Sequence, residues 1–274
     1  MSGTLWLVGT PIGNLGDVSD RAARTLEAVE VIACEDPRRT RKLLSHLGIP
    51  ARRLVSFNEG NERRQVPFIL DNLRAGRDVA VVSDAGMPGL SDPGYRLVVA
   101  CVAEEIPVDV VPGPSAVVAA LVVSGLPPAR FAFEGFLPRK EGERRVRLAS
   151  LADDPRTVVL FESPRRLRFL LADAQAALGD RRAAVVRELT KIHQEVLRGR
   201  LSELPARLPD EILGEIVVVI EGTPDRPQAD LDTLGERVEA LTAEGVPRKD
   251  AAARVAEEAG VSKRALYEAS LRRR

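Results

Sequence analysis

The chain has 274 residues, of which 45% are hydrophobic and 29% charged, a composition typical of a soluble globular protein with one large or two modest domains. Its 40 Lys and Arg residues balance its 40 Asp and Glu residues, so net charge neither favours nor excludes a nucleic-acid partner. No apolar run of about 18 residues and no signal segment is present, so we expect a cytoplasmic protein without a membrane span. Cys34 and Cys101 lie far apart in apolar surroundings, which predicts core residues rather than a disulfide or metal site.

The first part of the chain alternates short apolar runs with helical patterns. Strands are predicted at 5–8, 31–34, 54–57, 79–82 and 108–111. Helices are predicted between and after them, at about 20–30, 37–47, 64–75, 95–105 and 115–124. This alternation predicts an α/β fold with a parallel sheet covered by helices.

A loop rich in turn-forming residues follows three of these strands. Residues 83–94 contain three Gly, two Pro, two Asp and two Ser, a composition that holds backbone in turns and leaves N–H groups free. Residues 9–16 and 112–115 have the same character. Ligands of open α/β sheets bind at the carboxyl ends of strands, so the three loops predict one pocket. Each loop taken singly is equally compatible with a tight strand-to-helix connection.

The pattern changes after residue 125. Residues 131–136 alternate aromatic and small side chains, and residues 137–147 have five Lys or Arg against two Glu, which we interpret as a basic hinge. A mixed sheet is predicted from strands at 157–161, 183–187, 195–199 and 215–221, with a helix at about 164–178. The predicted lobes are 1–116 and 117–222.

The end of the sequence predicts a small helical unit. Residues 223–230 are a polar, Pro-containing linker, and 231–274 contain three short helical patterns separated by Gly residues. Their spacing is typical of a helix-turn-helix unit, although a docking bundle with a basic tail fits the same pattern.

Several common site types are excluded by their motifs. The sequence has no G-x-x-x-x-G-K-[ST], no G-x-G-x-x-G and no G-x-S-x-G, and His46 and His193 are its only histidines. A pocket of backbone amides, small side chains and carboxylates remains. It suits a cationic, adenosine-bearing cofactor, and we predict no metal.

Eight motifs, spread in order over residues 4–222, carry a resemblance to a known family. They are LVGTPIGNL from residue 7, ED with RRT at 35–40, NE at 58–59, SDAGMP with SDPG at 83–94, VPGPSA from 111, GFLPRK from 135, FESPR from 161 and RELTK from 187. The chain thereby resembles the ribosomal RNA small subunit methyltransferase I family, the cytidine 2′-O-methyltransferase branch of the tetrapyrrole methylase superfamily. Met87, Pro37 and Arg166 depart from the family's usual residues.

The resemblance implies a two-lobed fold that binds S-adenosylmethionine between its lobes, a homodimer, and 2′-O-methylation of a cytidine in small-subunit ribosomal RNA, naked or in the assembled 30S subunit. Carried over by position, the expected cofactor-binding residues are Thr10, Pro11, Ile12, Gly13, Ser83, Asp84, Ala85, Gly86, Leu90, Ser115, Ala116, Phe161, Glu162, Thr190, Gly214 and Glu215.

Methyl transfer to a hydroxyl requires alignment and a proton acceptor. Asp36, Glu59 and Glu188 follow predicted strands and can serve, with Glu59 preferred as base and Lys191 stabilising the developing oxyanion. A helix cap or an ion pair is the competing interpretation of each. The predicted RNA-binding residues, grouped near strand ends and in the hinge, are Arg38, Arg39, Arg139, Lys140, Arg165 and Arg166.

Two other functions fit parts of the sequence. One is a methyltransferase of the same superfamily that acts on a small molecule or a protein. The other is a helix-turn-helix regulator whose α/β portion senses a ligand.

Overall fold

The computed structural model describes residues 2–50, 53–223, 231–259 and 261–271, and the chain divides into two compact units. The first unit comprises Met1–Ala152 with Arg156–Glu221, and the second comprises Gly222–Arg274 with Asp153–Pro155. Most of the predicted linker, residues 224–230, lies outside the described residues, and the predicted domain limits stay a prediction. No helix in the described ranges is both long and apolar enough to cross a bilayer.

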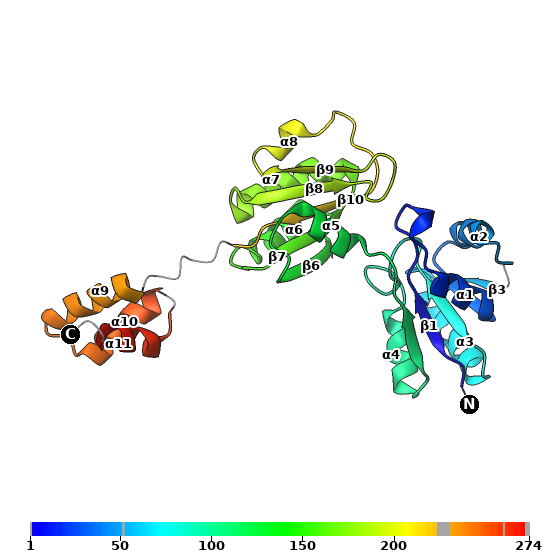
Figure 1. The fold of residues 1–274 in the computed structure, drawn as a ribbon, viewed down its shortest axis with the longest axis horizontal. Coiled ribbons are helices and arrows are strands. Elements are labelled where there is room, and N and C mark those ends of the chain that lie inside the picture. The colour runs from blue at the N-terminus through cyan, green and yellow to red at the C-terminus, as the bar shows by residue number, and fades with distance from the viewer. Residues whose placement is uncertain (1, 51–52, 224–230, 260, 272–274) are drawn as a thin grey trace. The chain divides into compact units, whose positions relative to one another are not determined.

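The first unit begins with a five-stranded parallel sheet, as predicted (Figure 1). Its strand order is β3-β2-β4-β1-β5. The strands are β1 (Leu5–Val8), β2 (Val31–Cys34), β3 (Arg53–Ser56), β4 (Val79–Val82) and β5 (Val108–Val111), and all neighbouring pairs are parallel. The central strands β2 and β4 are buried on both faces, which explains their unbroken apolar runs.

Alternate residues of these strands serve two helix layers. One face packs against α3 (Glu62–Arg74) and α4 (Tyr95–Ala103), and the opposite face packs against α1 (Asp20–Ala28) and α2 (Pro37–His46). Cys34 belongs to the core under α1 and α2, and Cys101 to the core under α3 and α4. Both are buried free thiols, so the prediction that they are core residues is confirmed.

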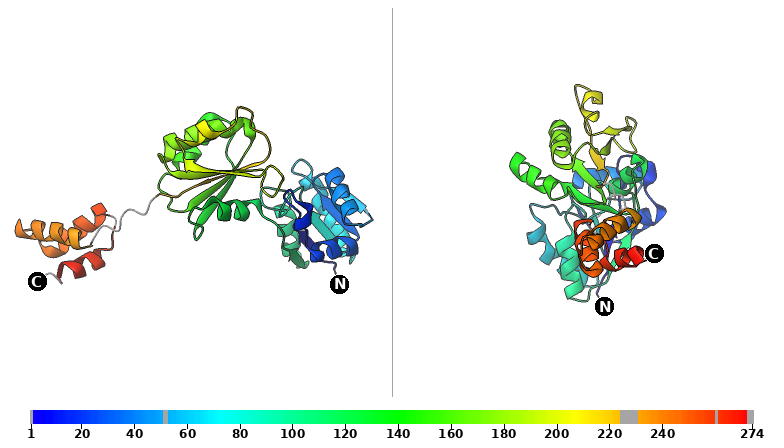
Figure 2. Two further views of the ribbon diagram at one scale, coloured as in Figure 1. Left: turned by 45° about the horizontal axis from the view of Figure 1, so that its top comes forward. Right: turned by 90° about the vertical axis from the view of Figure 1, so that its left-hand side faces the viewer.

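The second sheet of this unit is mixed, as predicted, with strand order β6-β7-β10-β8-β9. Its strands are β6 (Phe131–Phe136), β7 (Thr157–Glu162), β8 (Arg182–Arg187), β9 (Glu195–Arg200) and β10 (Ile216–Ile220). Of the described strand pairs in this sheet, β6 and β7 are parallel and the other three are antiparallel. The left view of Figure 2 shows helices on both sides of this sheet.

Helix α5 (Ala116–Ser124) follows the last strand of the first sheet but packs on the second. Its buried residues Val117, Ala120 and Leu121 share a core with β7, β8 and β10. The opposite face is covered by α6 (Glu141–Ala149), α7 (Leu167–Leu178) and α8 (Leu204–Arg207). The chain therefore passes from the first sheet to the second at the start of α5.

The prediction of a basic hinge at 137–147 is wrong, because most of this segment is helical. Residues from Glu141 onward form α6, which runs to Ala149. Arg144 is buried against Asp173 of α7, with Nη2 and Oδ2 2.6 Å apart. Arg145 bonds Asp173 and also Glu141 one turn away. These cations hold a helix in place instead of forming a free joint.

The second unit contains the three predicted helices, α9 (Leu231–Ala243), α10 (Arg248–Ala259) and α11 (Lys263–Leu271). The last residues of the predicted helical unit, 272–274, lie outside the described residues. The helices share one small core that includes Leu234, Val238, Val255 and Leu266. This core contains no residue of the first unit's four clusters.

Candidate active site

Strand order places the three turn-rich loops side by side. The loops after β4 (83–94), β1 (9–16) and β5 (112–115) follow three adjacent strands at their carboxyl ends. Thr10 and Gly86 exchange backbone hydrogen bonds, 2.9 Å and 3.1 Å long, which tie the β1 loop to the β4 loop. The hydroxyls of Thr10 and Ser83 donate to carbonyl groups of the β4 loop. The prediction that these loops converge is confirmed.

The β1 and β5 loops touch where both residues are glycine. A Cβ on Gly9 would lie 2.7 Å from the backbone of Gly113 and from the sulfur of Met87. A Cβ on Gly113 would lie 2.8 Å from the backbone of Gly9. Contacts this short are incompatible with a side chain, so close approach of the two loops requires both glycines.

A cavity of about 390 Å³ opens beside the three loops. One wall consists of loop residues, among them Ile12, Gly86 and Ser115. The other wall comes from the second sheet and its connections, among them Phe136, Phe161 and Glu162. This volume lies in the range of small-molecule sites, and apolar lining surface predominates.

The described charged residues that line the cavity are all acidic. Asp92, Glu162 and Glu215 line the cavity, whereas no Lys, Arg or His stands among its lining residues in the described part of the chain. Glu162 is 3% exposed, and its Oε2 has no hydrogen-bond partner, although the guanidinium of Arg166 lies 3.3 Å away. The hydroxyl of Ser115 makes no capping bond to α5. Such a cavity suits a ligand that carries positive charge and N–H donors.

Ten of the sixteen predicted cofactor-binding residues line this cavity. They are Ile12, Ala85, Gly86, Leu90, Ser115, Ala116, Phe161, Glu162, Gly214 and Glu215. The other six, Thr10, Pro11, Gly13, Ser83, Asp84 and Thr190, are absent from the lining. Thr10, Ser83 and Asp84 instead hold the loops together through hydrogen bonds.

Sequence reasoning also missed part of the lining. Met87, Ser91 and Asp92 belong to the β4 loop, so its high content of turn and acidic residues was a signal for them. The remaining missed residues are Val117, Phe136, Ser163, Pro164, Val186, Leu189, Ile216 and Val217. Four of them lie within the motifs GFLPRK, FESPR and RELTK, and no local motif marks the other four.

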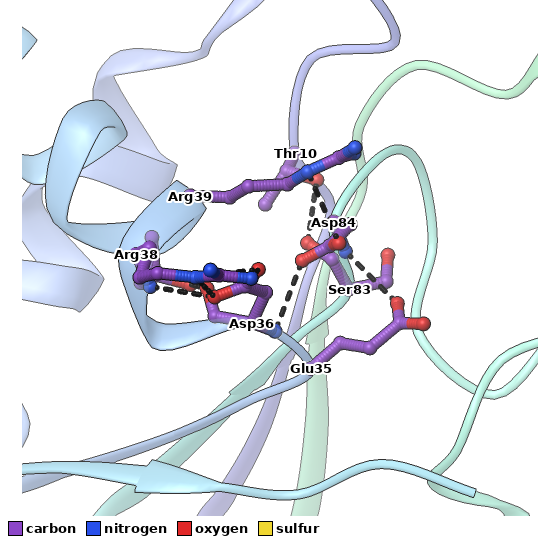
Figure 3. Close-up of polar contacts among 8 residues, drawn as sticks. Thr10, Glu35, Asp36, Arg38, Arg39, Ser83 and Asp84 are labelled. Carbon is purple, nitrogen blue, oxygen red and sulfur yellow. Dashed lines mark hydrogen bonds and ion pairs between the residues drawn. The ribbon is translucent and has the colours of Figure 1, made fainter.

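Asp36, a predicted proton acceptor, lies among charged groups at the ends of β2 and β4 (Figure 3). Its carboxylate accepts hydrogen bonds from Arg38, including one of 2.8 Å from Nη2. Hydrogen bonds from the Arg38 side chain and backbone lower the pKa of Asp36 to about 2. The Asp36 backbone N–H donates to Asp84, whose other oxygen lies 3.4 Å from Nε of Arg39. Asp36 is therefore a helix cap and ion-pair partner with low affinity for a proton.

Glu188 and Lys191 form a second polar group, beside the cavity. Lys191 Nζ lies 2.8 Å from Glu188 and 3.0 Å from Glu215. The hydrogen bond from Lys191 is the main cause of a lowered pKa at Glu188. Burial opposes the charge on Lys191, but hydrogen bonds to Glu188 and Glu215 outweigh it and raise the lysine pKa. Glu188 and Thr190 both have positive φ, 48° and 67°, so this segment is strained.

Glu59 lies exposed in the turn before α3 and is absent from the cavity lining. Of the predicted RNA-binding residues, Arg38, Arg39, Arg139, Lys140 and Arg165 are exposed. Arg166 is different, because its Nη2 donates to the carbonyls of Leu137 and Pro138 at 2.9 Å and 3.1 Å. Nη2 of Arg166 is thus bound within the protein.

Comparisons with known proteins agree with this architecture. Residues 4–205 match the model of the family described as Tetrapyrrole (Corrin/Porphyrin) Methylases, and residues 229–274 match the RsmI C-terminal HTH domain. Ribosomal RNA small subunit methyltransferase I of Mycobacterium tuberculosis is 49% identical over 276 residues, covering 100% of this chain and 96% of the relative. The chain belongs to the ribosomal RNA small subunit methyltransferase I family.

A shorter member of the same family is also informative. The protein of that name from Thermotoga maritima is 50% identical over 221 residues, which are 80% of this chain and 99% of the relative. Among solved structures, uroporphyrin-III C-methyltransferase from Thermus thermophilus, complexed with S-adenyl homocysteine, matches with a TM-score of 0.57 at 20% identity. The match covers 79% of this chain and 96% of that one, and shows the shared fold.

Membership in the ribosomal RNA small subunit methyltransferase I family confirms the predicted fold class and the prediction that the chain is a methyltransferase. It decides against a helix-turn-helix regulator that only senses a ligand.

Proposed function

We propose that this protein transfers a methyl group from S-adenosylmethionine to the ribose 2′-oxygen of a cytidine in small-subunit ribosomal RNA. The observation that carries the proposal is the cavity at the three converging loops, lined by carboxylates and free of basic side chains among the described lining residues. The names of its family relatives support the RNA substrate.

The residues of the cavity fit this donor, which when bound supplies a methyl group on a positively charged sulfur. The unpartnered oxygen of Glu162 can accept an N–H bond from the ligand. Phe136 and Phe161, with ring centroids 5.6 Å apart, offer aromatic surface to an adenine. The N-terminus of α5, which follows Ser115, is the positive end of the helix dipole and can bind the carboxylate of the donor.

Exposed basic residues adjoin the cavity in sequence and support an RNA partner. Arg165 directly follows the lining residue Pro164, and Arg139 lies three positions after Phe136. Arg39 pairs with Asp84, the neighbour of Ala85. Phosphates bound by these cations would bring a ribose toward the donor, and an accessible or splayed-out nucleotide suits such a surface.

The experiment is methyl transfer from labelled donor to RNA and to small ribosomal subunits that lack the modification. We expect 2′-O-methylcytidine after nuclease digestion and mass spectrometry. The rates on naked RNA and on assembled 30S subunits then show which of the two is the better substrate. Label on a base, on protein or on a tetrapyrrole instead would contradict the proposal.

We further propose that the protein acts in the cytoplasm as a homodimer. Helix α5 has no charged residue, yet Val118 and Val122 on its outer side are 51% and 67% exposed. Apolar surface of this kind is typical of a subunit contact. Light scattering should give twice the chain mass, and Val122→Lys should give the monomer mass; a monomeric wild type at micromolar concentration would contradict the assembly.

A further inference from the structure

Asp92 differs from the other two carboxylates of the cavity wall. Glu162 accepts a 2.7 Å hydrogen bond from the Ser163 backbone and pairs with Arg166, and Glu215 pairs with Lys191. Asp92 is half-buried, and within the described ranges no Lys or Arg forms an ion pair with it. Among the acidic lining residues, it is the one without a Lys or Arg partner in the described part of the chain.

The backbone around Asp92 is firmly held. Gly94 donates its N–H to Oε1 of the buried Glu62 at 3.0 Å, and Gly89 donates to the carbonyl of Pro93 at 3.2 Å. Ser91 has a φ of 61°, a conformation that a non-glycine residue rarely adopts. Strain of this kind is typical of functional loops, where it fixes the position of a side chain.

The surroundings of Asp92 raise its affinity for a proton. Burial raises the pKa of Asp92 to about 6, with a further contribution from the negative charges of Glu35 and Asp84. Glu35 lies at the end of β2 and bonds the Asp84 backbone, while Arg39 of α2 pairs with Asp84 (Figure 3). A proton acceptor works best when its pKa is near the working pH.

The carboxylates favoured from sequence do not share these properties. Asp36 is bound to Arg38 and Glu188 to Lys191, so both are neutralised by cations. Glu59 is exposed and outside the cavity lining.

We propose that Asp92 is the catalytic proton acceptor of the methyl transfer, an inference that rests on the proposed function. The Asp92 carboxylate takes the proton as the O–H bond of the ribose 2′-hydroxyl breaks. The oxygen bonds to the methyl carbon while the carbon–sulfur bond breaks, and that electron pair stays on sulfur, which becomes neutral. Asp92 then returns its proton to solvent.

The test replaces Asp92 by its neutral isostere. Asp92→Asn should lower kcat at pH 7.5 by about 100-fold or more. Calorimetry should find that its affinity for S-adenosylmethionine falls much less than kcat, since Glu162 and Glu215 still supply negative charge to the cavity. The acidic limb of the wild-type kcat profile, near pH 6, should disappear in Asp92→Asn and return with Asp92→Glu. Glu27→Gln, an exposed residue of α1, serves as the matched acidic control and should behave as wild type.

A measurement independent of activity tests the same carboxylate. In protein labelled with ¹³C at aspartate carboxyl groups, the resonance absent from Asp92→Asn identifies Asp92, and it should titrate near pH 6. Asp92→Glu also removes this aspartate resonance and gives the same assignment if Asp92→Asn does not fold. Titration below about pH 4.5 would overturn the proposal. A kcat within about 3-fold of wild type in Asp92→Asn would also overturn it, as would loss of the acidic limb in Glu59→Gln but not in Asp92→Asn. Wild-type enzyme that forms no 2′-O-methylcytidine would instead contradict the proposed function.

Discussion

Single residues at the loop junction set how closely the β1 and β5 loops approach each other. Gly9 and Gly113 leave no room for a methyl group, whereas Gly142 at the exposed start of α6 has open space around its Cα. The same substitution at the two kinds of site should therefore have opposite effects on stability.

Gly9→Ala should destabilise the protein by about 1–3 kcal/mol, because backbone or Met87 must move. It should also weaken donor binding, since the β1 and β4 loops form one wall of the cavity. Gly142→Ala should stabilise by about 0.5–1 kcal/mol through its better helix propensity. Urea unfolding and calorimetry provide the measurements; equal effects at both sites would contradict the tight packing at Gly9.

Asp92 should also give stability a distinctive pH dependence. Its folded-state pKa of about 6 lies above the ordinary value of 3.8, so between these pH values the folded protein retains a proton that the unfolded chain releases. Ionised Asp92 thus destabilises the folded state, increasingly from pH 4 to pH 6 and fully above. Asp92→Asn should gain stability over wild type between pH 5 and pH 8 in urea unfolding; a constant difference would show that Asp92 does not titrate in this range.

At the scale of elements, α6 is held to α7 by one buried carboxylate. Asp173 accepts bonds of 2.7 Å from Arg144 and 2.8 Å from Arg145. Burial raises the pKa of Asp173, but the bonds from both arginines outweigh it, and the net pKa is below the ordinary value. Ionised Asp173 therefore stabilises the folded state at pH values above the pKa of this group in the unfolded chain. The stabilisation is lost as the pH falls through the lower pKa of Asp173 in the folded state.

Asp173→Ala should cost about 3–5 kcal/mol in urea unfolding at pH 7, because it leaves the buried Arg144 without its partner. Asp71→Ala, which removes an exposed partner of Arg74, should cost no more than about 0.5 kcal/mol. Similar losses in both variants would mean that the buried pair contributes no more than a surface one.

At the scale of the whole molecule, the helical unit has its own core, and the Thermotoga maritima relative aligns over nearly its full length with only 80% of this chain. A protein ending at Thr223 should therefore fold and bind S-adenosylmethionine with unchanged affinity. Its methylation of ribosomal subunits should fall if the helical unit contacts the substrate. Circular dichroism, calorimetry and the transfer assay measure the three properties; loss of donor affinity would show that the first unit depends on the second.

The sequence by itself determined the order of strands and helices, the parallel and mixed character of the two sheets, and the three loops at the site. These features follow from local composition: apolar runs such as 79–82 specify buried strands, and Gly and Pro specify turns. The family resemblance also followed from sequence, because its motifs are contiguous.

Only the tertiary structure decided which side chains face the cavity and which carboxylates are neutralised. Asp36 and Asp92 both follow strands in acidic loops, yet Arg38 binds the first and no cation of the described chain pairs with the second. Strand order and the packing of α5 on the second sheet bring together residues more than a hundred positions apart. Proton affinity depends on burial and on charges within a few ångströms, and those distances are set by the folded chain.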